Sequence, residues 1–160
     1  MIWEGETIFL LPSYLQTFIM LSTKKEKDPS EGLILVVDDN EINRYIANKL
    51  LTQCGFEVEL AEDGQIAVDK VAAKQYDMIL MDIHMPVLDG FKATEIIRSY
   101  NEGKFNELPI VALTCSILER DLDEIDRSGM TDYIPKPFVP EELKRKVKDI
   151  LGLHYTNSKL

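Results

Sequence analysis

The fold of this chain is decided by the stretch DMILMDIHMPVLDG, residues 77–90. Residues 78–81 are entirely apolar and too few for a helix, so we expect a strand that is buried on both faces. Pro86 and Gly90 then predict a turn that leads into a helix. In an open parallel sheet, ligands bind just outside the carboxyl ends of the strands. We therefore expect Asp82 to lie at a ligand-binding edge.

The same alternation of a short apolar run and a helical pattern extends in both directions from this stretch. We predict strands at residues 33–37, 56–60, 78–81, 109–113 and 132–134. The apolar positions at helical spacing between and after them are Ile42, Tyr45, Ile46 and Leu50; Ala67 and Val71; Ala93, Ile96 and Ile97; Leu118, Leu122 and Ile125; and Leu143, Val147, Ile150 and Leu151.

Strands that alternate with helices in this way specify a parallel sheet that helices cover on both faces. Because crossovers are right-handed, few topologies remain, and we predict the doubly wound, flavodoxin-like α/β fold with five strands in the order 2-1-3-4-5. Residues 56–60 alternate between apolar and polar, which is typical of an edge strand. Asn40 is expected to cap the helix that follows the first strand.

In this topology, polar residues at the ends of four strands converge on one edge. They are Asp38 with Asp39, Asp82, Thr114 and Lys136. Clustered carboxylates repel one another unless a cation intervenes, and Mg²⁺ suits a site with few carboxylates and several waters. An ammonium group can hold a phosphoryl oxygen, and a hydroxyl can donate to it. This set of groups predicts in-line phosphoryl transfer to a carboxylate.

Residues 33–152 resemble a response-regulator receiver domain of two-component signalling. The resemblance rests on four motifs in order: VVDDN at 36–40, MDIHMPVLDG at 81–90, ALT at 112–114 and YIPKPF at 133–138. The opening DDNEIN at 38–43 is most similar to the receivers of hybrid histidine kinases.

The resemblance implies a role for each matching residue. Asp82 would accept phosphate from a phosphohistidine. Asp39 and Asp82 would bind Mg²⁺ directly, Asp38 mainly through water, and the backbone carbonyl of His84 would be a further ligand. The backbone N–H groups of His84 and Cys115 would face the phosphoryl oxygens.

The resemblance also implies a conformational switch. Thr114 would turn toward the phosphate and Tyr133 would follow it inward, although the spacing alone suits a half-buried core tyrosine equally well. Lys136 would hold the phosphate, and Lys136-Pro137 would be a cis peptide. The surface of the fourth helix, the fifth strand and the last helix would meet partners, and it allows a homodimer. The expected phosphodonor is a histidine kinase or a histidine phosphotransfer domain.

Charge and composition limit the kinds of partner and the cellular compartment that we expect for this chain. A formal net charge of −10 argues against non-specific binding of nucleic acid. The apolar run from Ile8 to Leu21 is shorter than a membrane span needs, and acidic residues precede it, so we expect neither a span nor a signal peptide. Two cysteines without a paired spacing favour a reducing, cytoplasmic compartment.

We divide the chain into an extension and linker at residues 1–32, a receiver domain at 33–153 and a tail at 154–160. The extension is either an amphipathic segment that packs on a partner or the remnant of a preceding domain. Residues 5–12, GETIFLLP, look like the closing strand of a histidine-kinase ATP-binding domain.

Three other functions are compatible with parts of this pattern. A phosphatase that works through an aspartyl-phosphate usually carries a second aspartate two residues after the nucleophile, and that position is His84 here. A receiver-like interaction module without phosphorylation would not need Asp82, Lys136 and Thr114 together. A flavin-binding protein of this topology would carry a run of phosphate-binding residues after the first strand, and none follows Val37.

Overall fold

The sheet is parallel, has five strands and follows the order β2-β1-β3-β4-β5, as the sequence predicts. The computed structural model describes residues 32–115 and 119–152, so the extension before Gly32, the predicted helical position Leu118 and the tail 154–160 lie outside the described residues. The strands are β1 Leu33–Val37, β2 Glu57–Ala61, β3 Met78–Asp82, β4 Ile110–Thr114 and β5 Asp132–Pro135. The helices are α2 Glu41–Gln53, α3 Gly64–Ala73, α4 Gly90–Ser99, the short 3₁₀ helix η2 Tyr100–Gly103, α5 Glu119–Ser128 and α6 Pro140–Ile150.

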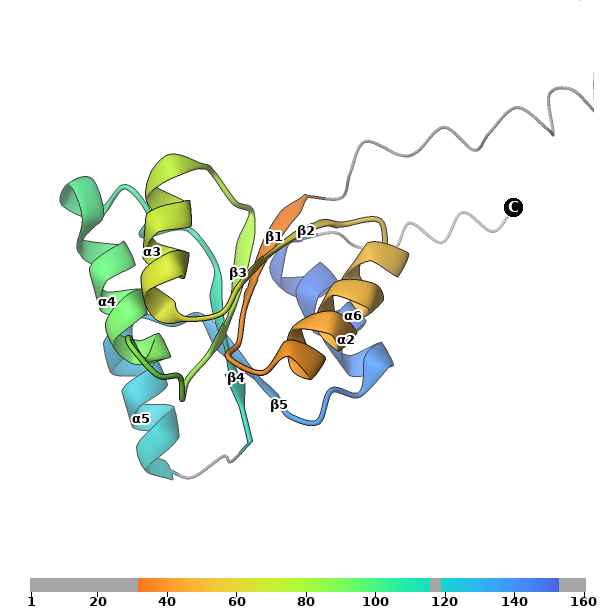
Figure 1. The fold of residues 1–160 in the computed structure, drawn as a ribbon. Coiled ribbons are helices and arrows are strands. Elements are labelled where there is room, and N and C mark those ends of the chain that lie inside the picture. Colours follow the sequence, from red (N-terminus) through yellow and green to blue (C-terminus); the bar gives the residue numbers. More distant parts are fainter. Residues whose placement is uncertain (1–31, 116–118, 153–160) are drawn as a thin grey trace, which may run out of the picture.

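Helices cover both faces of the sheet, with α3, α4 and α5 on one face and α2 and α6 on the other (Figure 1). Successive strand residues point to opposite faces, so each strand supplies both layers of the core. In β1, Leu35 and Val37 pack in the cluster under α3 and α4, whereas Ile34 and Val36 pack in the cluster under α2 and α6. Burial on both faces explains why the central strands are continuous apolar runs.

The edge position of β2 is confirmed, because β2 stands first in the sheet order and, within residues 32–115 and 119–152, pairs with β1 alone. Its burial is correspondingly incomplete: Ala61 is buried, while Glu57 and Leu60 are exposed. The alternation of apolar and polar residues in the sequence therefore correctly indicates that this strand lies at the edge of the sheet.

Helix α2 forms where the sequence predicts it, but of the four apolar positions at helical spacing Leu50 packs against the core and the other three are exposed. Ile42 is 67% exposed and Tyr45 is 62% exposed, and Ile46 is also exposed. The buried residues of the helix are Ala47 and Leu51. These two residues pack in the core together with the partly buried Leu50 and Cys54, and Ile42, Tyr45 and Ile46 remain exposed.

Candidate functional site

The register of the strands brings the predicted site residues to one edge. Val37 pairs with Met81, Asp82 with Leu113, and Thr114 with Pro135. Asp38 and Lys136 directly follow paired residues, and the backbone N–H of Lys136 donates to the carbonyl of Thr114 at 2.7 Å. The ends of β1, β3, β4 and β5 therefore meet at the carboxyl edge of the sheet, as predicted.

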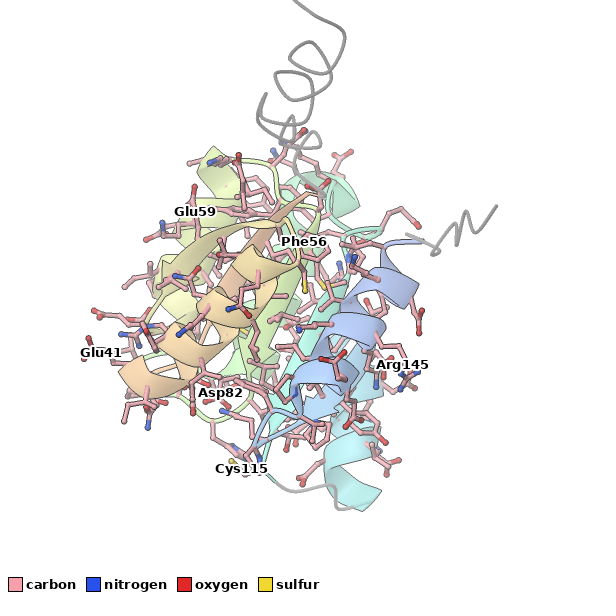
Figure 2. The ribbon with its side chains drawn as sticks, turned by 90° about the vertical axis from the view of Figure 1, so that its right-hand side faces the viewer. Glu41, Phe56, Glu59, Asp82, Cys115 and Arg145 are labelled. Atoms are coloured by element: carbon pink, nitrogen blue, oxygen red, sulfur yellow. The ribbon has the colours of Figure 1, made fainter. Side chains whose placement is uncertain are left out.

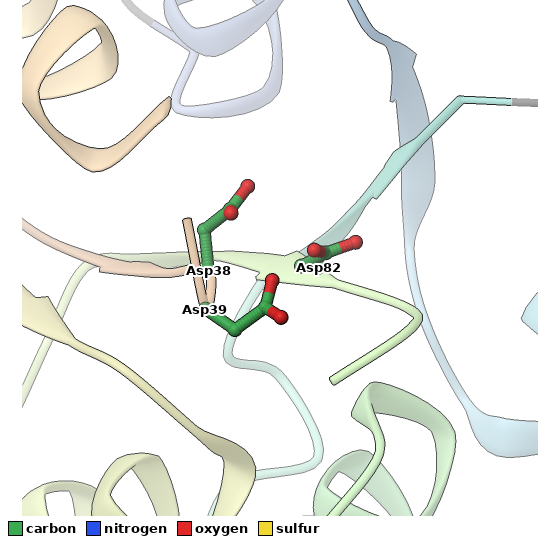
Figure 3. Close-up of side chains that lie close together, drawn as sticks. All are labelled: Asp38, Asp39 and Asp82. Carbon is green, nitrogen blue, oxygen red and sulfur yellow. The ribbon is translucent and has the colours of Figure 1, made fainter. Parts of the chain in front are cut away.

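Three carboxylates meet at this edge: Asp38, Asp39 and Asp82 each place one oxygen within 4.8 Å of the others (Figure 3). Asp38 is wholly buried and Asp82 is 6% exposed, whereas Asp39 is exposed to solvent. These oxygens are the hard donors that Mg²⁺ prefers, and the exposed side leaves room for waters. The residues present therefore fit a divalent cation.

Lys136 joins the two buried carboxylates. Its ammonium nitrogen lies 2.8 Å from Oδ2 of Asp38 and 2.9 Å from Oδ2 of Asp82, and its side chain is 8% exposed. A single cation thus partly balances two buried negative charges. The charge balance of this edge is incomplete without a further positive group.

Burial and these neighbours perturb the two titrating groups. Burial raises the pKa of Asp82; the hydrogen bond from Lys136 opposes this effect, the charge of Asp38 adds to it, and the net shift is upward. Burial acts to lower the pKa of Lys136, but its hydrogen bonds to Asp38 and Asp82 outweigh burial and raise that pKa. Lys136 is therefore held as a cation.

The loop after Asp82 is fixed close to the carboxylate. The backbone N–H of His84 lies 3.4 Å from Oδ1 of Asp82, and the N–H of Gly90 donates to the carbonyl of Ile83 at 2.9 Å. A Cβ atom at Gly90 would lie 2.1 Å from the backbone oxygen of Asp82, so only glycine fits. Val87 in the same loop has a φ of 69°, which is strained for a β-branched residue.

The remaining predicted residues lie around this centre. Thr114 is buried at the end of β4, and Cys115 is exposed beside it. Asp82 and Cys115 lie at the same end of the molecule (Figure 2). Lys136-Pro137 is a cis peptide, as the resemblance implies. Tyr133 is half-buried, and the ammonium of Lys146 from α6 lies 4.6 Å from its ring centre.

The sequence did not single out the residues that hold Asp38. The side-chain nitrogen of Asn43 lies 3.1 Å and 3.2 Å from the two carboxylate oxygens of Asp38, and Arg44 donates to its backbone carbonyl at 2.6 Å. Asn40 caps α2 as predicted and also donates its N–H to Asp38 at 2.9 Å. In the sequence, Asn43 is only one residue of a motif. Its contact with Asp38 depends on where α2 lies relative to the end of β1.

Comparison with known proteins agrees with this geometry. Residues 34–148 match the family model described as the response regulator receiver domain. The chain belongs to this family. Receiver domains are the phosphoacceptors of two-component signalling, and this one has the five-stranded fold of that group.

Relatives of this receiver domain include histidine kinases. It is 34% identical to histidine kinase 5 of Arabidopsis thaliana over 149 residues, and 39% identical to the sensor protein GacS of Pseudomonas syringae pv. syringae over 125 residues. Each alignment covers 78% of this chain but only 16% and 14% of the respective relative. The chain thus corresponds to a small part of those proteins.

A solved structure is similar over nearly its whole length. The receiver domain of the sensor histidine kinase PA1611 from Pseudomonas aeruginosa PAO1 is 40% identical, with a TM-score of 0.69 over 76% of this chain and 98% of that one. That crystal structure has a magnesium ion coordinated in the active site cleft. Among the described residues of this receiver domain, no helix is long and apolar enough to cross a membrane.

Proposed function

We propose that this receiver domain is a phosphorylation-operated switch in which Asp82 accepts a phosphoryl group from a phosphohistidine. The observation that carries the proposal is the bridge that Lys136 makes between Asp38 and Asp82. It supports a site in which a carboxylate nucleophile is already aligned beside a cation at the ligand-binding edge of the sheet.

In the proposed reaction, a carboxylate oxygen of Asp82 attacks the phosphorus atom of the donor. A P–O bond forms, the P–N bond to the imidazole breaks, and its electron pair returns to the imidazole nitrogen. Lys136 holds a phosphoryl oxygen after the transfer, and the backbone N–H groups of His84 and Cys115 donate to the others. Such a reaction depends mainly on positioning and on charge neutralisation.

Asp39, Asp82 and the backbone carbonyl of His84 would hold Mg²⁺ directly in this proposal, and Asp38 would hold it through water. When bound, the ion neutralises the charge that gathers on the carboxylates and the phosphoryl oxygens. The exposure of Asp39 beside two buried carboxylates supports this division, because a partly hydrated ion needs an open side.

The signal would leave the site through Thr114 and Tyr133. Phosphorylation adds charge that Thr114 can reach with its hydroxyl, and the space this frees would let Tyr133 turn inward. The position of Tyr133 on β5, beside α6, supports an output surface made of α5, β5 and α6. A homodimer through that surface is one form the output can take.

The outward apolar side chains of α2 support docking of the donor next to the site. Ile42, Tyr45 and Ile46 are exposed on a helix that begins two residues after Asp39. An exposed apolar row of this kind typically marks a protein contact, and its position fits a partner that presents a phosphohistidine to Asp82. We therefore propose a histidine kinase or a histidine phosphotransfer domain as the partner, and a place for this receiver within a hybrid kinase.

The proposal is tested with a small phosphodonor or beryllofluoride in the presence of Mg²⁺. We expect the wild-type protein to be labelled once, at Asp82, and Asp82→Asn to remain unlabelled. EDTA should abolish the labelling. Absence of labelling in the wild type, or equal labelling of Asp82→Asn, would contradict a phosphoacceptor role for Asp82.

A further inference from the structure

The carboxylate of Asp38 is held by hydrogen bonds on both of its oxygens. Oδ1 accepts from the N–H of Asn40 at 2.9 Å and from the side chain of Asn43 at 3.1 Å. Oδ2 accepts from the same Asn43 nitrogen at 3.2 Å and from Lys136 at 2.8 Å. The side chain of Asp38 is wholly buried, so no bulk water competes for these oxygens.

These contacts occupy most of the accepting capacity of the carboxylate. An ionised carboxylate offers about four lone-pair sites, two on each oxygen. Three donor nitrogens make four contacts with these sites, and the Asn43 nitrogen is shared between the two oxygens. Direct coordination of a metal ion by Asp38 competes with these contacts, whereas a metal-bound water can donate to an oxygen that the Asn43 nitrogen only shares.

We propose that Asn43 is a positioning residue that withholds Asp38 from direct metal coordination and so sets the preference of the site for Mg²⁺ over Ca²⁺. This inference rests on the proposed function, because it concerns the metal site of the phosphoacceptor. Of the donors to Asp38, the N–H of Asn40 is fixed by the start of α2, and Lys136 also serves Asp82. The side-chain amide of Asn43, by contrast, contacts both carboxylate oxygens of Asp38.

The consequence for ion choice follows from coordination chemistry. Mg²⁺ keeps several waters and takes one or two carboxylates in octahedral geometry, whereas Ca²⁺ accepts more carboxylates at longer and more variable distances. With Asp38 withheld, Asp39 and Asp82 are the two carboxylates left for direct contact. If Asn43 is removed, one site on each oxygen of Asp38 is freed, and an oxygen of Asp38 already lies within 4.8 Å of oxygens on the other two acids.

The test is isothermal titration of the full chain with MgCl₂ and with CaCl₂, for the wild type, Asn43→Leu and Asn43→Ala. We expect both variants to bind Ca²⁺ about tenfold more tightly than the wild type, with a change of less than about threefold for Mg²⁺, because a third carboxylate favours the larger ion. Asn43→Gln keeps the amide and should retain most of the wild-type ratio of the two dissociation constants. Asn48→Leu, on the same helix, is the matched control, since Asn48 accepts its hydrogen bond from Thr52 rather than donating to Asp38.

The outcomes separate this inference from the proposed function. An unchanged ratio of Ca²⁺ to Mg²⁺ affinity in Asn43→Leu and Asn43→Ala, with normal phosphorylation of the wild type, overturns the role of Asn43 alone. Weaker binding of both ions in these variants also overturns it, because it indicates that Asn43 supports coordination by Asp38. Failure of the wild type to bind either ion overturns both proposals. Circular dichroism in EDTA establishes that each variant is folded before titration.

Discussion

The ammonium of Lys136 lies 2.9 Å from the carboxylate of Asp82, and both side chains are 8% exposed. The same ammonium serves Asp38, so its removal leaves two buried carboxylates without their shared cation. Breaking a buried ion pair on one side is costly, because the remaining charge is neither solvated nor paired.

We therefore predict that Lys136→Met lowers the free energy of unfolding in EDTA by about 3 kcal/mol, the range found for broken buried pairs. Millimolar Mg²⁺ should recover part of this loss, because the ion brings back positive charge. Urea unfolding with and without Mg²⁺ measures both effects. Lys144→Met, which removes only a surface pair with Glu141, is the control and should change stability little. Equal stability of Lys136→Met and the control would contradict the prediction.

Gly90 sets the position of the Asp82 backbone. A Cβ atom there would lie 2.1 Å from the carbonyl oxygen of Asp82 and 3.0 Å from the side chain of Met81, so the backbone must shift. We predict that Gly90→Ala costs about 2 kcal/mol of stability, as overpacking does, and reduces phosphorylation of Asp82 at least tenfold. Glu95→Ala, on an exposed position of the same helix, should be neutral in both assays. A Gly90→Ala protein with wild-type labelling would show that the loop adapts without moving Asp82.

Lys146 holds Tyr133 in its half-buried position. Its ammonium lies over the ring, donates to the Tyr133 carbonyl and pairs with Asp132 at 2.8 Å. If Tyr133 turns inward on phosphorylation, these contacts favour the unphosphorylated arrangement. We predict that Lys146→Met lowers the beryllofluoride concentration at half-saturation by about threefold, and lowers stability by about 1 kcal/mol. Titration followed by NMR of Tyr133 measures the first effect. The same stability loss with an unchanged midpoint would refute a role in the switch.

A second charged cluster stabilises the opposite end of the domain, where Glu59 lies far from Asp82 in Figure 2. Glu59 accepts hydrogen bonds from Lys74 at 2.5 Å, from Tyr76 at 2.7 Å and from Lys70 at 3.1 Å. These bonds lower the pKa of Glu59 from 4.5 to about 2. Burial, together with the bond to Glu59, raises the pKa of Tyr76.

The pH dependence follows from the direction of that shift. A carboxyl whose pKa is lower in the folded state adds stability above pH 4.5, and loses it as the pH falls from 4.5 toward about 2. The full shift would correspond to roughly 3 kcal/mol, which we reduce to about 1 kcal/mol because solvent screens the partly exposed pair. Glu59→Gln should therefore be less stable than the wild type at pH 7, with a difference that shrinks by pH 3. Urea unfolding across this range measures it; a difference independent of pH would exclude the ionic origin.

Local patterns in the sequence were sufficient to predict the order of the helices and strands and to identify the polar residues at the strand ends. Apolar runs of strand length, helical spacing and turn residues depend only on neighbours, and right-handed crossovers then limit the topology. Asp38, Asp82, Thr114 and Lys136 follow from that topology, because parallel strands end at one edge. The predicted edge position of β2 and the Asn40 cap of α2 are correct for the same reason.

Only the tertiary structure decided which side of α2 is buried and which side chains reach Asp38 and Glu59. The apolar residues of α2 at helical spacing include Tyr45, yet Ala47 and Leu51 are the buried residues of the helix and Tyr45 is exposed. Lys136 and Asp38 are 98 positions apart, and no local pattern encodes that contact. The spacing of apolar residues in the sequence shows where a helix or strand forms. The rotation of a helix about its own axis depends instead on the packing of all its neighbours at once.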